Sequence, residues 1–366
     1  MSTNIITIKK YRISMILLSI FIFIIARFLL PSTDEADYHD RINTILNIEA
    51  PFFAYYKYFK PLFISINPSQ DFLDFDYYII RLLFSFLIVF PIYIFILIIN
   101  SSQIDKHSLW VDKKNVVILT LLFPGIWFHL GLFSVESFTL MLFLLIIFIN
   151  NLALKILLLV AASMIDIGNA AIFLLFIIYY LFINIILNKF GKKYMVIFII
   201  ILLLICNIFS MSLLQLIEWL PLIGDKAFFI IDQYNNVYQI NDKYPLVLRP
   251  FIALMSMIFM LPVSHLMAWP IYPACFYFLV KIGWKSILDE NINLNMTASF
   301  FAAITLFLTV PMILPGFSNG KYYVFVIPFI LNIGLFYYKK SKVFNFIILS
   351  NFIVFLCLIF NLAFNY

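Results

Sequence analysis

Long apolar runs separated by short polar segments recur along the whole chain. A run of about 20 apolar residues is long enough to cross the hydrocarbon core of a bilayer as a helix. The pattern predicts eleven spans, at residues 13–30, 77–99, 115–133, 137–149, 156–165, 170–188, 194–217, 251–280, 296–315, 322–338 and 343–364. We therefore predict an all-α, polytopic integral membrane protein with a single transmembrane domain over residues 1–366.

Polar segments between the spans predict the topology. Residues 31–76 and 218–249 form the two longest polar segments, and alternation of the spans puts both outside the cytosol. Cytoplasmic segments carry an excess of Lys and Arg. The cytoplasmic side then holds 15 of the 24 basic residues, namely Lys9, Lys10, Arg12, Lys106, Lys113, Lys114, Lys155, Lys189, Lys192, Lys193, Lys281, Lys285, Lys339, Lys340 and Lys342. Of the 18 acids only Asp105, Asp112, Asp289 and Glu290 share that side, so the acids gather outside.

Two predicted spans, 137–149 and 156–165, are too short to cross about 30 Å of hydrocarbon at about 1.5 Å per residue. The hairpins that precede and follow them can therefore end below the outer surface. In that case Glu136 and Asp166 line a cavity. The alternative is that both acids are polar hairpin residues at the water interface.

Composition narrows the class of protein. Apolar residues make up 64% of the chain and charged residues only 11%, which excludes an ordinary soluble domain. The net charge of +6 comes from basic residues scattered over short loops, so it does not indicate nucleic-acid binding. Cys206, Cys275 and Cys357 lie inside apolar runs and show no metal or disulfide spacing, so we interpret them as core residues.

The segment 31–40, Pro-Ser-Thr-Asp-Glu-Ala-Asp-Tyr-His-Asp, directly follows the first span. It places Asp34, Glu35, Asp37 and Asp40 next to His39. Carboxylates in such a group can accept a proton from a hydroxyl nucleophile, bind a divalent metal, or simply lie in water. Ser32 and Glu35 also have the spacing of a capping box, in which Glu35 only closes the start of a helix.

Asp34-Glu35-Ala36-Asp37-Tyr38 resembles the Asp-Glu-x-x-Tyr segment of GT-C type membrane glycosyltransferases, which also stands just after the first span. Lys60-Pro61-Leu62 is similar to the Pro-Pro-Leu of that family with one proline missing. Arg81 early in the second span and Glu136 in a later hairpin are similar in type and position. The resemblance covers mainly residues 13–150.

The resemblance implies sugar transfer, with inversion, from a polyprenyl-phosphate-linked donor to a glycan or lipid-linked acceptor at the external membrane face. It implies that Asp34 is the general base and that Glu35 either orients the acceptor or joins a metal site. No cofactor is required, and the alternative of a divalent metal stays open. The implied setting is the bacterial cytoplasmic (inner) membrane, with membrane lipids and no nucleic acid as partners.

Further polar residues are candidates for substrate binding. They are Asp37, Tyr38, His39, Arg81, Glu136, Asp166, Lys243, Arg249 and Lys321. Arg81, Lys243, Arg249 and Lys321 could stabilise the phosphate of the leaving group. Each of them could instead extend toward lipid headgroups. His129 lies within a span, where a polar side chain usually bonds a neighbouring helix.

Two other functions stay open. A polymerase of O-antigen or capsule repeat units also uses polyprenyl-linked sugars and long external loops, and it would suit residues 218–249 with Arg249. A transporter or flippase predicts acids and bases paired in the middle of the membrane. Here the ionisable residues gather at the ends of the spans, which argues against transport.

Overall fold

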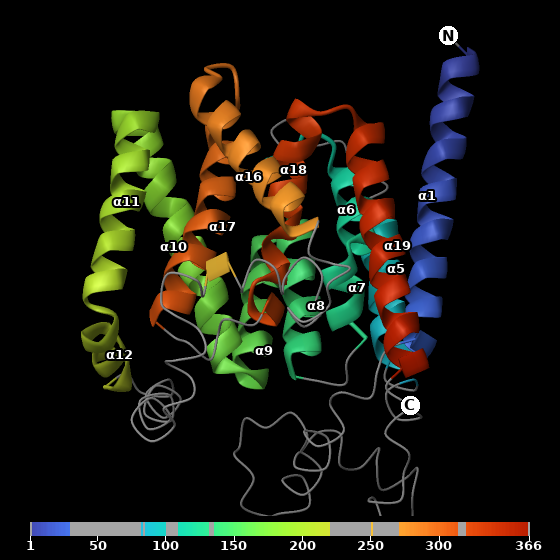
Figure 1. Cartoon of the computed structure of the whole chain (residues 1–366), viewed down its shortest axis with the longest axis horizontal. Helices are drawn as coiled ribbons and strands as arrows, with labels where there is room; N and C mark the ends of the chain where they lie inside the picture. The colour runs from blue at the N-terminus through green and yellow to red at the C-terminus, as the bar shows by residue number, and fades with distance from the viewer. Residues whose placement is uncertain are drawn as a thin grey trace, which may run out of the picture.

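The protein is a bundle of helices (Figure 1). The computed structural model describes residues 2–29, 82, 85–99, 109–131, 135–219, 250–251, 271–313 and 320–364. Within these ranges the α-helices are α1 (Ser2–Leu29), α5 (Phe90–Ile99), α6 (Lys113–Leu122), α7 (Pro124–His129), α8 (Val135–Phe148), α9 (Leu152–Ile165), α10 (Ile167–Phe190), α11 (Lys192–Ile208), α12 (Ser210–Glu218), α16 (Ile271–Leu288), α17 (Leu294–Ile313), α18 (Ile327–Tyr337) and α19 (Lys340–Phe364). Shorter helical turns are η2 (Ser85–Val89), η5 (Gly320–Tyr322) and η6 (Val324–Val326). The described ranges contain no strand, which confirms the all-α class.

Within the ranges that the structure describes, three helices are long and apolar enough to cross a membrane. They are α10, α17 and the part of α19 from Lys340 to Ile359. Large apolar side chains also cover outward faces of the bundle, and Ile98, Ile208 and Phe352 are each more than half exposed. Such surfaces are unfavourable in water and favourable in lipid. These features are those of a multi-pass membrane protein.

Of these three helices α17 is the most buried, since 78% of an 18-residue apolar stretch in it lies inside the bundle, against 39% in α10 and in α19. The small side chains of Ala302 and Ala303 are fully buried, which lets α10 and the other neighbouring helices approach closely. Thr305 and Thr309 donate hydrogen bonds to carbonyls of their own helix at 2.7 and 2.8 Å. The hydroxyls of Tyr179 on α10 and Thr309 are also hydrogen bonded, at 3.0 Å.

An aromatic core joins α8, α10, η6 and α18. Phe143 stacks on Phe173 with ring centroids 4.4 Å apart, and Phe173 contacts Phe325 of η6 at 5.1 Å. Phe176 packs on Phe329 at 4.9 Å. These contacts hold η6 and the start of α18 against α8 and α10. Because η5 directly precedes η6, they also fix the position of Lys321.

The third predicted span, 115–133, is not one continuous helix. Helix α6 ends at Leu122, Phe123 is extended (φ −69°, ψ 132°), and Pro124 begins α7. Proline disfavours the helical conformation of the residue before it and has no N–H to donate to the preceding turn. The sequence analysis predicted the span from its apolar run and did not include the effect of Pro124, which divides it into two helices.

The carbonyls released by this break find other partners. The Tyr93 hydroxyl lies 3.3 Å from the Leu121 carbonyl. The Asn351 side chain donates to the Leu122 carbonyl at 2.8 Å and accepts from the Trp127 indole at 2.6 Å. Because bilayer lipid offers no hydrogen bonds, such replacements are what makes a broken helix tolerable inside a membrane protein.

Arg27 supplies a further partner to α7. Its side chain is only 1% exposed, donates to the Trp127 carbonyl through Nη2, and donates to the Phe23 carbonyl at 3.2 Å. Its guanidinium also lies 4.2 Å from the Phe23 ring centroid. The sequence showed Arg27 only as an interruption of the first span, whereas the structure gives it a role in joining α1 to α7.

Other element bounds also differ from the predicted spans. Helix α1 includes the basic amino-terminal segment that was predicted to precede the first span. The seventh span, 194–217, is divided at Phe209 into α11 and α12. Helix α16 continues beyond Val280 to Leu288. Cys206, Cys275 and Cys357 are buried and free, which confirms them as core residues.

Most lysines of the described ranges gather at one end of the bundle, where Asp289 and Glu290 also lie. Figure 1 shows that α1 begins at the same end at which α10 meets α11, α16 meets α17, and α18 meets α19. We call this end the basic end, because these junctions carry Lys189, Lys192, Lys193, Lys285, Lys339, Lys340 and Lys342. We call the opposite end the acidic end, where α8 begins with Glu136, α9 meets α10 at Asp166, and α12 ends with Glu218.

Side-chain contacts at the basic end agree with this arrangement. Lys192, at the start of α11, donates to the Ser286 carbonyl at 2.8 Å and to the Asp289 carbonyl. Lys285 of α16 lies 5.1 Å from the Tyr338 ring centroid at the end of α18. Cations near helix C-termini are favourable because the last carbonyls lack intrahelical donors. These lysines therefore tie neighbouring junctions together.

Replacement of Asn351 by Leu should destabilise the protein. The variant removes the acceptor of the Trp127 indole and the donor to Leu122, and we expect a loss of about 1–3 kcal/mol in unfolding free energy. Asn345→Leu, at an exposed position of the same helix, is the matched control and should change stability little. Thermal or denaturant unfolding in detergent measures both variants. Equal stability of the two would contradict the role of Asn351.

Candidate functional site

The most distinctive polar feature within the bundle is an ion pair between residues far apart in sequence. Lys321 Nζ lies 2.8 Å from Glu136 Oε1. The Glu136 side chain is 11% exposed and the Lys321 side chain 24%. Glu136 stands in the first turn of α8, where the helix dipole favours a carboxylate, and Lys321 stands in η5. Both residues were predicted site residues, and the structure brings them together.

Hydroxyl and amide side chains fix the start of α8 in place. Ser137 donates to the His129 carbonyl at 2.5 Å, which joins α8 to the end of α7. Thr139 donates to the Glu136 carbonyl at 3.1 Å, and Asn169 of α10 donates to the Thr139 hydroxyl at 3.2 Å. The orientation of Glu136 therefore depends on α7 and α10 as well as on its own helix.

Asp166 has a clear structural role. Its carboxylate accepts from the backbone N–H groups of Gly168 and Asn169 at 2.8 and 3.3 Å, and from the Asn169 side chain at 3.2 Å. It is thus the N-cap of α10 and at the same time ends α9. The predicted meeting of two helices at residues 166–169 is confirmed, and the cap explains why an acid stands there.

Tyr322 contacts the ion pair, and Asp166 is joined to the helix that carries Glu136. Lys321 Nζ lies 5.3 Å from the Tyr322 ring centroid. The Asn169 side chain donates to the Asp166 carboxylate and to the Thr139 hydroxyl of α8, at 3.2 Å each. We call Glu136, Lys321, Tyr322, Asp166 and His129 the acidic-end cluster.

His129 completes the cluster from α7. Its side chain is 2% exposed, and its ring meets the Phe128 ring edge to face at 5.8 Å. Among the described residues, no group forms a hydrogen bond with its Nε2 atom. The expectation that this imidazole bonds a neighbouring helix is therefore not met at Nε2. The His129 carbonyl accepts from Ser137, the residue next to Glu136.

The other predicted site residues lie outside the described residues. They are Asp34, Glu35, Asp37, Tyr38, His39, Arg81, Lys243 and Arg249. The metal alternative concerned Glu35 and lies outside them too. Within the ranges that the structure describes, no three His, Cys, Asp or Glu side chains gather in a group that could hold a metal ion.

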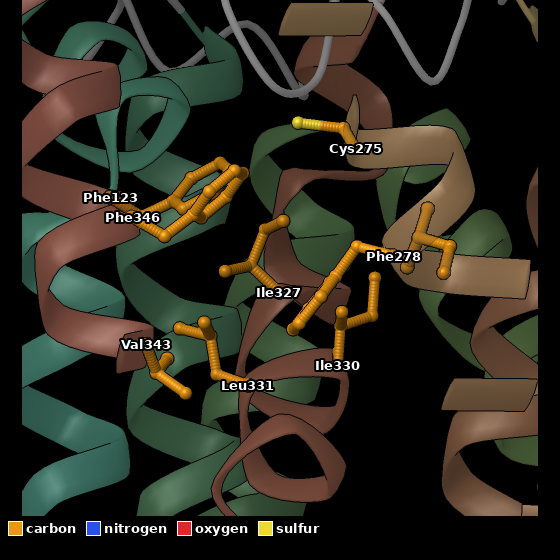
Figure 2. Close-up of a pocket in the computed structure, with 9 residues that line it drawn as sticks. Phe123, Cys275, Phe278, Ile327, Ile330, Leu331, Val343 and Phe346 are labelled. Atoms are coloured by element: carbon orange, nitrogen blue, oxygen red, sulfur yellow. The ribbon is translucent and has the colours of Figure 1, made fainter. Parts of the chain in front are cut away.

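A small apolar pocket lies elsewhere, between α16, α18 and α19 (Figure 2). Phe278, Ile330 and Phe346 are among its lining residues, and the Cys275 side chain lies above the other labelled side chains in the view. The described side chains that line it are hydrocarbon apart from this one thiol. It offers no acid, base or hydrogen-bonding group for chemistry, so it is not a candidate site.

Sequence reasoning missed two members of the acidic-end cluster. Tyr322 follows Lys321 directly and could have been selected as its neighbour in a segment rich in aromatic residues. His129 stands seven residues before Glu136, a spacing that would share a face on one continuous helix. The break between α7 and α8 removes that argument, so only the folded structure places His129 beside the ion pair.

The Glu136–Lys321 pair should couple strongly in a double-mutant cycle. Glu136→Gln or Lys321→Met alone leaves a largely buried charge without its partner, and we expect about 2–3 kcal/mol of destabilisation from each. The double variant should recover much of this loss. Glu290→Gln and Lys193→Met, at exposed positions of the basic end, serve as controls for charge alone. Unfolding in detergent gives the energies, and simple additivity would argue against the pair.

Comparison with known proteins assigns this chain to no family. No family model, no curated protein and no solved structure matches it. The resemblance to GT-C type glycosyltransferases therefore rests on the residues quoted above and on their position after the first predicted span.

Proposed function

We propose that this protein is an inverting membrane glycosyltransferase. It transfers a sugar from a polyprenyl-phosphate-linked donor to a surface polysaccharide or lipid-linked glycan. Its place is the bacterial cytoplasmic (inner) membrane, which the chain crosses with eleven spans, and its site faces outward. The supporting observation is that Glu136, Asp166 and Lys321, selected from the sequence as site residues, gather at one end of an otherwise apolar bundle.

The course of α1 supports placing the reaction at the acidic end of the bundle. Helix α1 begins at the basic end and reaches the acidic end at Leu29, five residues before Asp34 (Figure 1). Helix α1 thus ends at the end of the bundle where the acidic-end cluster lies, and the proposal places Asp34 close to that end. Cationic residues mark the cytoplasmic side of membrane proteins, so the basic end faces the cytosol in this proposal and the acidic end faces outward.

In the proposed reaction, Asp34 accepts the proton of the acceptor hydroxyl as its oxygen bonds to the anomeric carbon. The bond from that carbon to the lipid phosphate oxygen breaks, and the phosphate leaves with the electron pair. General-base catalysis of this kind contributes about two to four orders of magnitude in rate. Arg81, Lys243 and Arg249 are the proposed partners of the leaving phosphate.

A transporter is less well supported than a transferase. The Glu136–Lys321 pair lies at the start of α8 and in the turn between α17 and α18, at the ends of helices. Charge pairs that mark a transport pathway are expected along the middle of the membrane.

Asp34→Asn should abolish the glycan product. An amide cannot accept the acceptor proton, so the rate should fall by about two to four orders of magnitude while the protein level stays normal. The glycan profile of cells expressing the variant measures this, with Asp289→Asn at the basic end as control. An unchanged profile at normal abundance would remove the proposed base. Tolerance of Asp34→Asn with loss of product in Arg249→Ala would favour a repeat-unit polymerase.

The two ends of the bundle should label from opposite sides of the membrane. Trp219 is 86% exposed next to α12, and Glu290 is exposed between α16 and α17. A membrane-impermeant maleimide should label Trp219→Cys in intact cells and Glu290→Cys only after permeabilisation. The three native cysteines are buried and provide a low background. The reverse pattern would place the acidic end in the cytosol and overturn the proposed orientation.

A further inference from the structure

His129 is a buried polar side chain with an unused hydrogen-bonding atom. It is 2% exposed, and none of the described residues forms a hydrogen bond with Nε2. Burial of such a group without a partner is unfavourable, and the great majority of buried polar atoms in proteins have one. A leucine or phenylalanine would fill this place in α7 without that disadvantage. The imidazole therefore calls for an explanation outside the stability of the fold.

The charges around His129 indicate what kind of ligand it can meet. The His129 carbonyl accepts from Ser137, the residue next to Glu136, and Glu136 and Lys321 neutralise each other at 2.8 Å. The Asp166 carboxylate is joined to the first turns of α8 through Asn169 and Thr139. A phosphate placed here would meet a carboxylate beside the only lysine of the cluster and would gain little. A neutral hydroxyl, by contrast, can donate to a carboxylate and exchange a hydrogen bond with an imidazole.

We propose that His129, with the Glu136–Lys321 pair, forms a subsite that binds a hydroxyl group of the saccharide substrate. This inference rests on the proposed function and deepens it, because it assigns Lys321 to the sugar and leaves the phosphate to other cations. The ligand approaches from the side of Lys321, whose side chain is the more exposed of the pair. His129 Nε2 is the hydrogen-bonding atom held ready at the inner end of this subsite.

Two His129 variants separate binding from structure. His129→Phe keeps an aromatic ring of similar size and removes the polar atom. Since Nε2 has no protein partner in the described structure, this change should leave the thermal midpoint of unfolding equal to or above that of the wild type. His129→Gln places an amide near the position of Nε2 and should keep the hydrogen bond to a ligand.

The experiment measures binding to the full-length protein in nanodiscs by saturation-transfer NMR and by thermal shift. The probes are the methyl glycosides of glucose, galactose, mannose and N-acetylglucosamine, and, separately, inorganic phosphate. We expect at least one glycoside to bind the wild type, His129→Phe to weaken that binding about tenfold, and His129→Gln to restore it to within about threefold. Phosphate should not compete with the glycoside.

Other results overturn the inference. Glycoside binding that is equal in the wild type and His129→Phe removes His129 from the subsite but leaves a saccharide-binding function intact. Phosphate binding that depends on Lys321 and excludes glycosides would show the cluster to be an anion site. A lower unfolding midpoint of His129→Phe with unchanged ligand binding would show that His129 has a structural role. Absence of glycoside binding by the wild type would also refute the subsite. The Asp34→Asn glycan profile tests the transferase function separately from all these outcomes.

Discussion

The need to satisfy backbone hydrogen bonds without water controls the architecture around α7. Pro124 divides a membrane-buried segment into α6 and α7 and releases carbonyls from the helical pattern. Side chains from other helices meet the carbonyls on both sides of the break: the Tyr93 hydroxyl of α5 lies near the Leu121 carbonyl, and Asn351 of α19 donates to the Leu122 carbonyl. Arg27 of α1 donates to the Trp127 carbonyl near the end of α7. These side chains supply hydrogen bonds that lipid cannot supply to a broken helix. The same contacts fix α1, α5 and α19 around α7.

The break also creates the position of the acidic-end cluster. Because α7 is short and separate from α6, its last residue, His129, can direct its carbonyl to Ser137 at the start of α8. That contact holds the first turn of α8, from which Glu136 reaches Lys321. On the other side, the aromatic contacts of Phe325 with Phe173 hold the chain that carries Lys321. The helix break at Pro124 and the acidic-end cluster are thus connected through α7 and the start of α8.

Sequence patterns predicted the features that depend on local composition. Apolar runs gave the helical class, and Asp166 at the meeting of α9 and α10 followed from a polar residue between two such runs. The pairing of Glu136 with Lys321 could not be predicted, because 185 positions separate two residues that only the packing of α8 against the α17–α18 connection brings together. The burial of Arg27 was equally hidden, since its partner, the Trp127 carbonyl near the end of α7, stands 100 positions away in the sequence.

The two buried polar regions differ in a way that bears on function. Around the break, Asn351 both donates and accepts, and Arg27 donates to two carbonyls, so polar atoms there serve the fold. In the acidic-end cluster, Asp166 likewise serves as a helix cap, but His129 presents a buried nitrogen that no described residue uses. Replacing His129 with an apolar residue would remove this buried nitrogen and should stabilise the fold. The imidazole is therefore better explained by an interaction with a ligand than by the packing of α7.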